Sequence, residues 1–227
     1  MLDFISSIAI LIAAFAVLVG VYTWKRGFVG KRRIELAESV LALFYEAEDA
    51  IKQIRSPHSF DGEGSKRKRA NNELAEESRL LDQANVVFER YQKREKLFAQ
   101  IRSMRYRVMA AFGSSATEPF DELNKIINEI FLAARMLGTH YWPRQGRVEM
   151  APEEFKKHLE ALHEYEEVFW YLGEAKDKIS PRVQKAVEKM EGITQAAFVA
   201  QDSILDDVID DIRNSITRRK KPFRTRE

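Results

Sequence analysis

The stretch FISSIAILIAAFAVLVGVYTW, from Phe4 to Trp24, decides where the rest of this chain can lie. It contains no charged residue, and its only clearly polar side chains are those of Ser6, Ser7 and Thr23. As an α-helix it would be about 30 Å long, which matches the hydrocarbon thickness of a bilayer. A helix of this length in a soluble protein normally has a polar stripe, and this one has none. The sequence therefore predicts a transmembrane helix over 4–24, within an anchor of residues 1–26.

The charges that flank this segment predict its orientation. Only Met1, Leu2 and Asp3 precede it, whereas a basic group follows it: Lys25, Arg26, Lys31, Arg32 and Arg33. Basic flanks stay on the cytoplasmic side of a membrane. We therefore expect the N-terminus outside and the bulk of the chain in the cytoplasm, as in a protein of the bacterial inner membrane. A cleavable signal peptide is the alternative, but no basic segment precedes the apolar run and no small-x-small cleavage site follows it.

Small side chains recur along one side of the predicted span, at alternating spacings of three and four: Ser6, Ala9, Ala13, Ala16, Gly20 and Thr23. Small residues let transmembrane helices approach each other closely. The same register continues through Gly27 and Gly30 to Phe44. This seam predicts association with a second copy of the chain or with another membrane protein. Alternatively, the small residues are ordinary membrane-helix composition, and the two glycines break the helix.

The composition of the whole chain predicts an all-α protein. Only 10 of its 227 residues are Gly and 6 are Pro, and no segment alternates like a strand between hairpin turns. The absence of cysteine excludes disulfides, zinc–thiolate sites and thiol catalysis. The formal net charge of +2 gives no overall attraction to a polyanion.

Beyond the anchor, apolar residues at helical spacing predict an elongated cytosolic helical bundle over 27–217, with long, coiled-coil-like helices. The predicted helices cover roughly 33–55, 71–112, 118–137, 152–178 and 181–217, and residues 218–227 form a basic tail. Thr117 and Ser180 are candidate N-caps. The helix over 71–112 fits either a coiled-coil seam with Arg94 and Arg105 as polar interruptions or a wider amphipathic face in a bundle, and we favour the bundle.

The segment THYWPRQGRVEMA, which follows Gly138, is the longest aromatic-bearing loop that the sequence predicts. Loops of this kind tend to hold ligand or partner contacts. His140, Tyr141 and Trp142 are therefore candidate partner-binding residues. The alternative is that Tyr141 and Trp142 close one end of the bundle.

Acidic residues near the C-terminus give a weak candidate metal site, at Asp206, Asp207 and Asp210. Carboxylates one helical turn apart can hold Mg²⁺ bridged to a diphosphate. The DDxxD pattern resembles the metal motif of isoprenoid synthases, but over five residues only and without a second metal motif. Glu160 and His163 have the spacing of a di-iron helix, yet no second such pair exists. The simpler interpretation is a solvated helix face, and the sequence predicts no cofactor.

The basic tail contains Arg218, Arg219, Lys220 and Lys221, and with the basic residues after the span it is expected to lie at an anionic membrane surface. The sequence thus predicts a single-pass, membrane-anchored scaffold, adaptor or signalling partner that acts by helix–helix association, without enzymatic activity or a small-molecule substrate. One alternative is metal-dependent phosphate or diphosphate chemistry at the acidic cluster. Another, less favoured, is membrane-tethered nucleic-acid binding through the tail.

Overall fold

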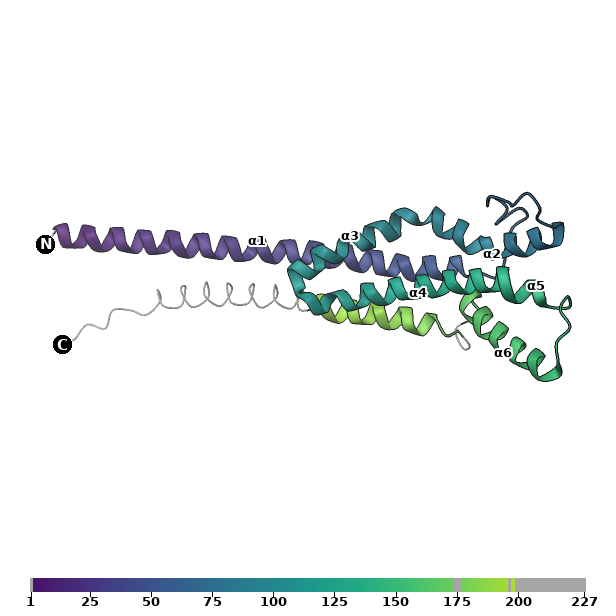
Figure 1. The fold of residues 1–227 in the computed structure, drawn as a ribbon. Coiled ribbons are helices and arrows are strands. Elements are labelled where there is room, and N and C mark those ends of the chain that lie inside the picture. Colours follow the sequence, from purple (N-terminus) through teal and green to yellow (C-terminus); the bar gives the residue numbers. More distant parts are fainter. Residues whose placement is uncertain (1, 174–176, 196, 199–227) are drawn as a thin grey trace. The chain divides into compact units, whose positions relative to one another are not determined.

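The computed structural model describes residues 2–173, 177–195 and 197–198, with side chains from residue 16 onward (Figure 1). Within these residues every regular element is helical and no strand occurs, which confirms the all-α prediction. The chain divides into two units, Met1–Ser39 with Gly192–Glu227, and Val40–Glu191.

Helix α1 runs without interruption from Leu2 to Ile54. Of the two alternatives that the sequence leaves open, a break at the glycines or one continuous helix, the structure has the continuous helix. Gly27 and Gly30 lie inside α1 and do not break it, because extending an existing helix is far easier than nucleating a new one. Each glycine weakens the helix by only about 1 kcal/mol relative to alanine.

No helix in the part of the chain searched, which leaves out residues whose placement is uncertain, is long and apolar enough to cross a membrane. Most of the predicted span 4–24 falls in residues whose side chains lie outside the described part, namely 4–15. Ser6, Ala9 and Ala13 of the predicted seam are among them.

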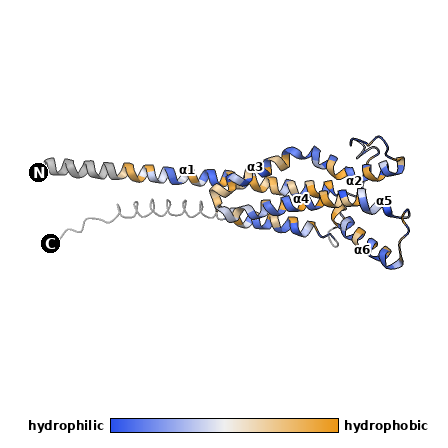
Figure 2. Cartoon of the chain, viewed as in Figure 1, coloured by the Kyte–Doolittle hydropathy of each residue, from blue (hydrophilic) through white to orange (hydrophobic). Residues whose placement is uncertain are grey.

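The unit Val40–Glu191 is a helical bundle, as predicted. Its core gathers apolar side chains from the end of α1, from α4 (Glu118–Met136) and from a helical stretch that begins at residue 180. Phe44 of α1 meets Phe120 of α4 edge to face, with ring centroids 5.0 Å apart. Apolar and polar positions alternate along α4 in Figure 2, which is the pattern of an amphipathic helix with one face in a core.

The predicted helix over 71–112 is two helices, α2 (Ala75–Lys93) and α3 (Glu95–Phe112). Arg94 leaves the helical conformation between them, with φ −106° and ψ 10°. The prediction of one continuous helix is wrong, because contacts between aromatic side chains outweigh the helical spacing of apolar residues in the sequence. Tyr91 stacks on Phe98 of α3 and also meets Phe131 of α4 edge to face, at centroid distances of 4.8 and 4.9 Å.

The chain stays helical after α4, where the sequence predicts a loop. A π-helical turn, η2 (Leu137–Tyr141), leads into the short helix α5 (Trp142–Arg144). Gly138 permits this path, because a Cβ atom there would lie 2.6 Å from the Cβ of Ala84 in α2. The loop is therefore confined to the residues between α5 and α6.

Helix α6 (Pro152–Phe169) begins at the predicted residue 152, with a proline in its first turn, but ends before the predicted residue 178. Trp170 is extended, with φ −95° and ψ 142°. At the next helix, the carboxylate of Asp177 accepts a hydrogen bond of 2.7 Å from the backbone N–H of Ser180, so Asp177 and not Ser180 supplies the cap. Thr117 likewise makes no side-chain cap bond. The predicted helix end at 217 lies outside the described residues.

Candidate functional sites

Residues 16–24 of α1 expose a surface without a charged side chain, and exposed Phe28 and Val29 follow beyond Lys25 and Arg26. Every residue in this range is exposed, and Leu18 and Trp24 are 69% and 71% accessible. A methyl group added at Gly20, Gly27 or Gly30 would meet no atom within 4 Å. Ala16, Gly20 and Thr23 of the predicted seam are thus open. Further along the helix, Leu36 is the first buried apolar residue. Helix α1 therefore changes from a segment exposed on all sides to one with a buried face.

An aromatic and basic ladder, Trp24–Phe28–Arg32, marks the end of this exposed segment. The rings of Trp24 and Phe28 stack with centroids 5.8 Å apart and planes at 21°. The guanidinium carbon of Arg32 lies 5.1 Å from the centroid of Phe28, a cation–π contact. Within the described part of the chain, no ion pair involves any basic residue of this region: Lys25, Arg26, Lys31, Arg32 and Arg33.

The predicted partner loop is mostly built into the fold. Trp142 is buried, its indole N–H donates a 2.9 Å hydrogen bond to Glu166, and its ring meets Phe169 edge to face. This placement fits the alternative interpretation, in which Trp142 closes one end of the bundle. Tyr141 is half-buried, and only His140 is exposed. Sequence spacing could not separate these three neighbours because the turn from η2 into α5 places each in a different environment.

His158 of α6 is buried beneath Tyr141, with ring centroids 5.4 Å apart. Its Nε2 atom has no hydrogen-bond partner among the described residues. Burial lowers the pKa of His158 below its ordinary value, Arg144 and His140 lower it further, and Glu154 opposes them. The fold therefore favours the neutral form of this histidine.

A buried arginine, Arg55, joins three parts of the unit Val40–Glu191. Its guanidinium forms a paired contact with Asp177, at 2.9 Å from Nη1 and 2.5 Å from Nη2. The same side chain donates to backbone carbonyl oxygens at the end of α6, namely those of Glu167, Val168 and Trp170. These bonds occupy the carbonyl groups that a helix end leaves without partners, which explains why α6 ends at Phe169. Sequence reasoning missed this site.

Arginines also organise the segment between α1 and α2. Arg90 donates to the carbonyl oxygens of Ser56 and His58, each at 2.6 Å, and to the carboxylate of Glu63. Hydrogen bonds from Arg90 hold the pKa of Glu63 below its usual value. Arg67 and Arg69 both bind Asp82 of α2. Two of the four basic residues in the run over 66–69 are thus paired with a carboxylate, and of these Arg69 remains exposed.

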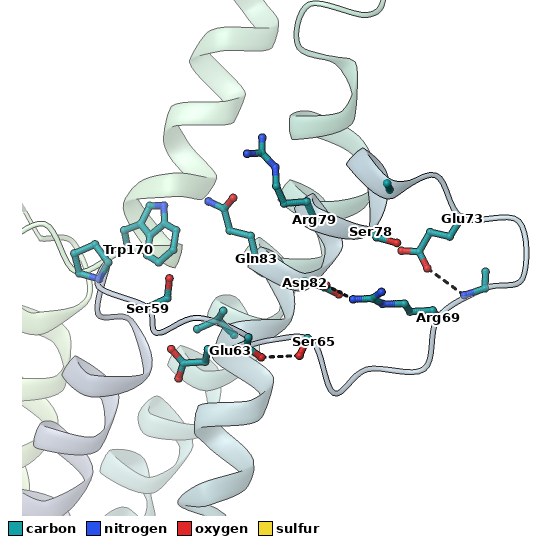
Figure 3. Close-up of a pocket in the computed structure, with 15 residues that line it drawn as sticks. Ser59, Glu63, Ser65, Arg69, Glu73, Ser78, Arg79, Asp82, Gln83 and Trp170 are labelled. Carbon is teal, nitrogen blue, oxygen red and sulfur yellow. Dashed lines mark hydrogen bonds and ion pairs between the residues drawn. The ribbon is translucent and has the colours of Figure 1, made fainter.

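A cavity of about 750 Å³ lies between this segment and α2 (Figure 3). Trp170 lies on one side of it, and Glu73 and Arg69 lie on the other. Its charged lining is already largely paired: Arg67 binds Glu73, and Arg69 binds Asp82. The Ser78 hydroxyl also hydrogen-bonds to Glu73, so much of the polar lining already has partners within the fold.

No group of three or more acidic or histidine side chains that could hold a metal occurs in the described part of the chain. The weak metal candidates Asp206, Asp207 and Asp210 lie outside it. So do the basic residues of the tail: Arg218, Arg219, Lys220 and Lys221. Glu160 and His163 lie on α6, and no second pair of this kind accompanies them among the described residues.

No protein-family model matches this chain, and no curated protein or solved structure is significantly similar to it.

Proposed function

We propose that this protein is a single-pass membrane protein whose N-terminal helix anchors a helical scaffold or adaptor unit that acts through helix–helix association. The observation that carries the proposal is the exposed, uncharged surface of α1 over 16–24. Soluble monomers rarely expose contiguous apolar patches of more than a few hundred Å². The uncharged sequence continues back to Phe4, so a bilayer is the environment that fits this helix.

The orientation that we propose places the N-terminus outside and the bundle in the cytoplasm of a bacterial cell. Support comes from Lys25–Arg33, where the basic residues form no ion pairs within the described chain and remain free to hold the cytoplasmic flank. The adaptor role is supported by the all-helical unit Val40–Glu191, whose described side chains bring together no catalytic constellation.

Membrane fractionation tests the anchor. The full chain, expressed in bacteria, should stay in the membrane pellet after alkaline carbonate washing and should be released by detergent. A matched chain that lacks residues 1–26 should appear in the soluble fraction. Protease added to sealed, right-side-out spheroplasts should leave the bundle intact. Extraction of the full chain by carbonate alone would refute the proposal.

Cross-linking in membranes tests the association face. Replacing Ala16 and Gly20 together by Leu should abolish most of the cross-linked dimer, because large side chains prevent close approach of two helices. The matched control replaces Val17 and Val21 by Leu, which adds bulk to another face of the same helix. If both double variants cross-link like the unmodified chain, these small residues do not mediate association.

A further inference from the structure

We propose that Trp24, Phe28 and Arg32 form a binding site for an anionic phospholipid at the cytoplasmic membrane surface, with Arg32 as the ligand of the headgroup phosphate. The inference rests on the membrane anchor proposed above, and it adds the class of lipid and the residue that binds it. Three observations support it: the level of these residues relative to the bilayer, the stacking that orients Arg32, and the charge of the surrounding residues.

The depth follows from helix geometry. A hydrocarbon core of about 30 Å that begins at Phe4 ends near Trp24, and the headgroup layer beyond it is roughly 5–8 Å thick. Phe28 lies one turn further, about 6 Å along the axis. Side chains on a helix lean toward its N-terminus, so Arg32 reaches back over Phe28, as its distance of 5.1 Å from the ring centroid shows. The guanidinium is thereby brought to the level of the lipid phosphates.

The stacking supplies a preorganised ligand. Trp24 and Phe28 lie face to face, and the indole of Trp24 suits the boundary between hydrocarbon and headgroups. Phe28 in turn limits the orientations of the Arg32 guanidinium. A planar guanidinium binds a phosphate through two parallel hydrogen bonds, and no carboxylate among the described residues competes for Arg32. Arg33 follows directly in sequence but makes no aromatic contact in the described structure.

The surrounding charge selects the lipid. No acidic residue occurs between Asp3 and Glu35, while the basic group from Lys25 to Arg33 occupies the headgroup end of the segment. This group attracts lipids with a net negative charge and repels the choline of a zwitterionic headgroup. Phosphatidylglycerol therefore meets both requirements, a phosphate for Arg32 and a net negative charge for its neighbours.

Native mass spectrometry of the full chain, released from micelles with equal amounts of phosphatidylglycerol and phosphatidylcholine, tests the site. The ratio of the two bound lipids is the readout. Arg32→Gln should lower the preference for phosphatidylglycerol about fivefold, whereas Arg33→Gln, which removes the same charge, should lower it less than twofold. Phe28→Leu, which keeps every charge, should also lower it because the platform for Arg32 is lost.

Two results would overturn the site: equal effects of Arg32→Gln and Arg33→Gln, which would indicate diffuse charge attraction, or no lipid preference in the unmodified chain. Either result leaves the membrane anchor intact, because carbonate extraction reports on it independently. Conversely, release of the unmodified chain by carbonate would refute the anchor itself, and the lipid site would fall with it.

Discussion

At the scale of single residues, Arg55 and Asp177 form an ion pair in which both side chains are fully buried. Burial alone raises the pKa of Asp177, but hydrogen bonds from Arg55 and Ser180 outweigh it and hold that pKa below its ordinary value. The carboxylate thus remains ionised and serves two partners, the guanidinium and the start of the next helix.

Asp177→Asn should lower the free energy of unfolding by about 3–5 kcal/mol, because it leaves the charge of Arg55 buried without a counter-charge. Urea unfolding followed by circular dichroism measures the loss. The matched control is Asp121→Asn, which breaks the exposed pair with Arg105 and should cost less than about 1 kcal/mol. Equal losses in the two variants would contradict the role given to Arg55.

His158 predicts a dependence of stability on pH. Because its pKa is lowered in the folded chain, the unfolded state binds more protons as the pH falls below about 6.5. The contribution of His158 to the free energy of unfolding is therefore complete above that pH. It is lost progressively as the pH falls toward the lower pKa of the folded state. The charges of Arg144 and His140 disfavour protonation of the ring, and the charge of Glu154 favours it.

We expect the free energy of unfolding of the unmodified chain to fall between pH 7.5 and pH 5.5, and His158→Leu to reduce that fall. Urea titrations at the two pH values provide the measurement. His163→Leu, on an exposed position of the same helix, should leave the pH dependence as it is. An unchanged fall in His158→Leu would assign the effect to other groups.

At the scale of elements, Gly64 fixes the segment between α1 and α2 against α2. Its φ is +88°, and a Cβ atom would lie 1.9 Å from the backbone oxygen of Asp82. Gly62 also has a positive φ, of +78°, but a Cβ atom there would meet only Ser65, at 3.9 Å. A side chain at Gly62 would therefore meet only backbone strain, whereas a side chain at Gly64 would meet backbone strain and a steric clash with α2.

Gly62→Ala should cost about 1–3 kcal/mol, the range for backbone strain alone. Gly64→Ala should cost clearly more, because the segment must also move away from α2 and strain the ion pairs between Arg67 or Arg69 and Asp82. Thermal unfolding of both variants gives the comparison. Similar losses would show that the segment can shift without penalty.

Sequence patterns predicted the helix boundaries that depend on neighbouring residues. They failed at the boundaries that depend on contacts between residues far apart in the sequence. Pro119 and Pro152 mark the first turns of α4 and α6, and both helices begin there. The break at Arg94 depends on aromatic rings from three helices. The end of α6 depends on Arg55, which lies 112 residues before Glu167 along the chain. The Arg55–Asp177 pair, at a separation of 122 residues, has no local signature either.

At the scale of the whole molecule, the two units carry different kinds of surface. Exposed apolar side chains are concentrated over 16–29, whereas the buried apolar residues of the described chain begin at Leu36. The unit Val40–Glu191 has its own core and its own network of ion pairs, so it should fold without the exposed segment.

A chain that begins at Arg33 should therefore remain helical and soluble without detergent, while the full chain should require detergent to stay dispersed. Circular dichroism and size-exclusion chromatography of both chains check this expectation. Aggregation of the shortened chain would show that the first part of α1 is needed for folding and is more than an anchor.

The single continuous helix α1 also has a mechanical consequence. It leads from the proposed membrane segment to Arg55, whose side chain donates five hydrogen bonds inside the bundle. Tension applied to the N-terminal end of this helix would load those bonds in parallel, because no loop in between can extend and relieve it. A pull on that end would thus be transmitted along α1 to the end of α6 and to the cap at Asp177.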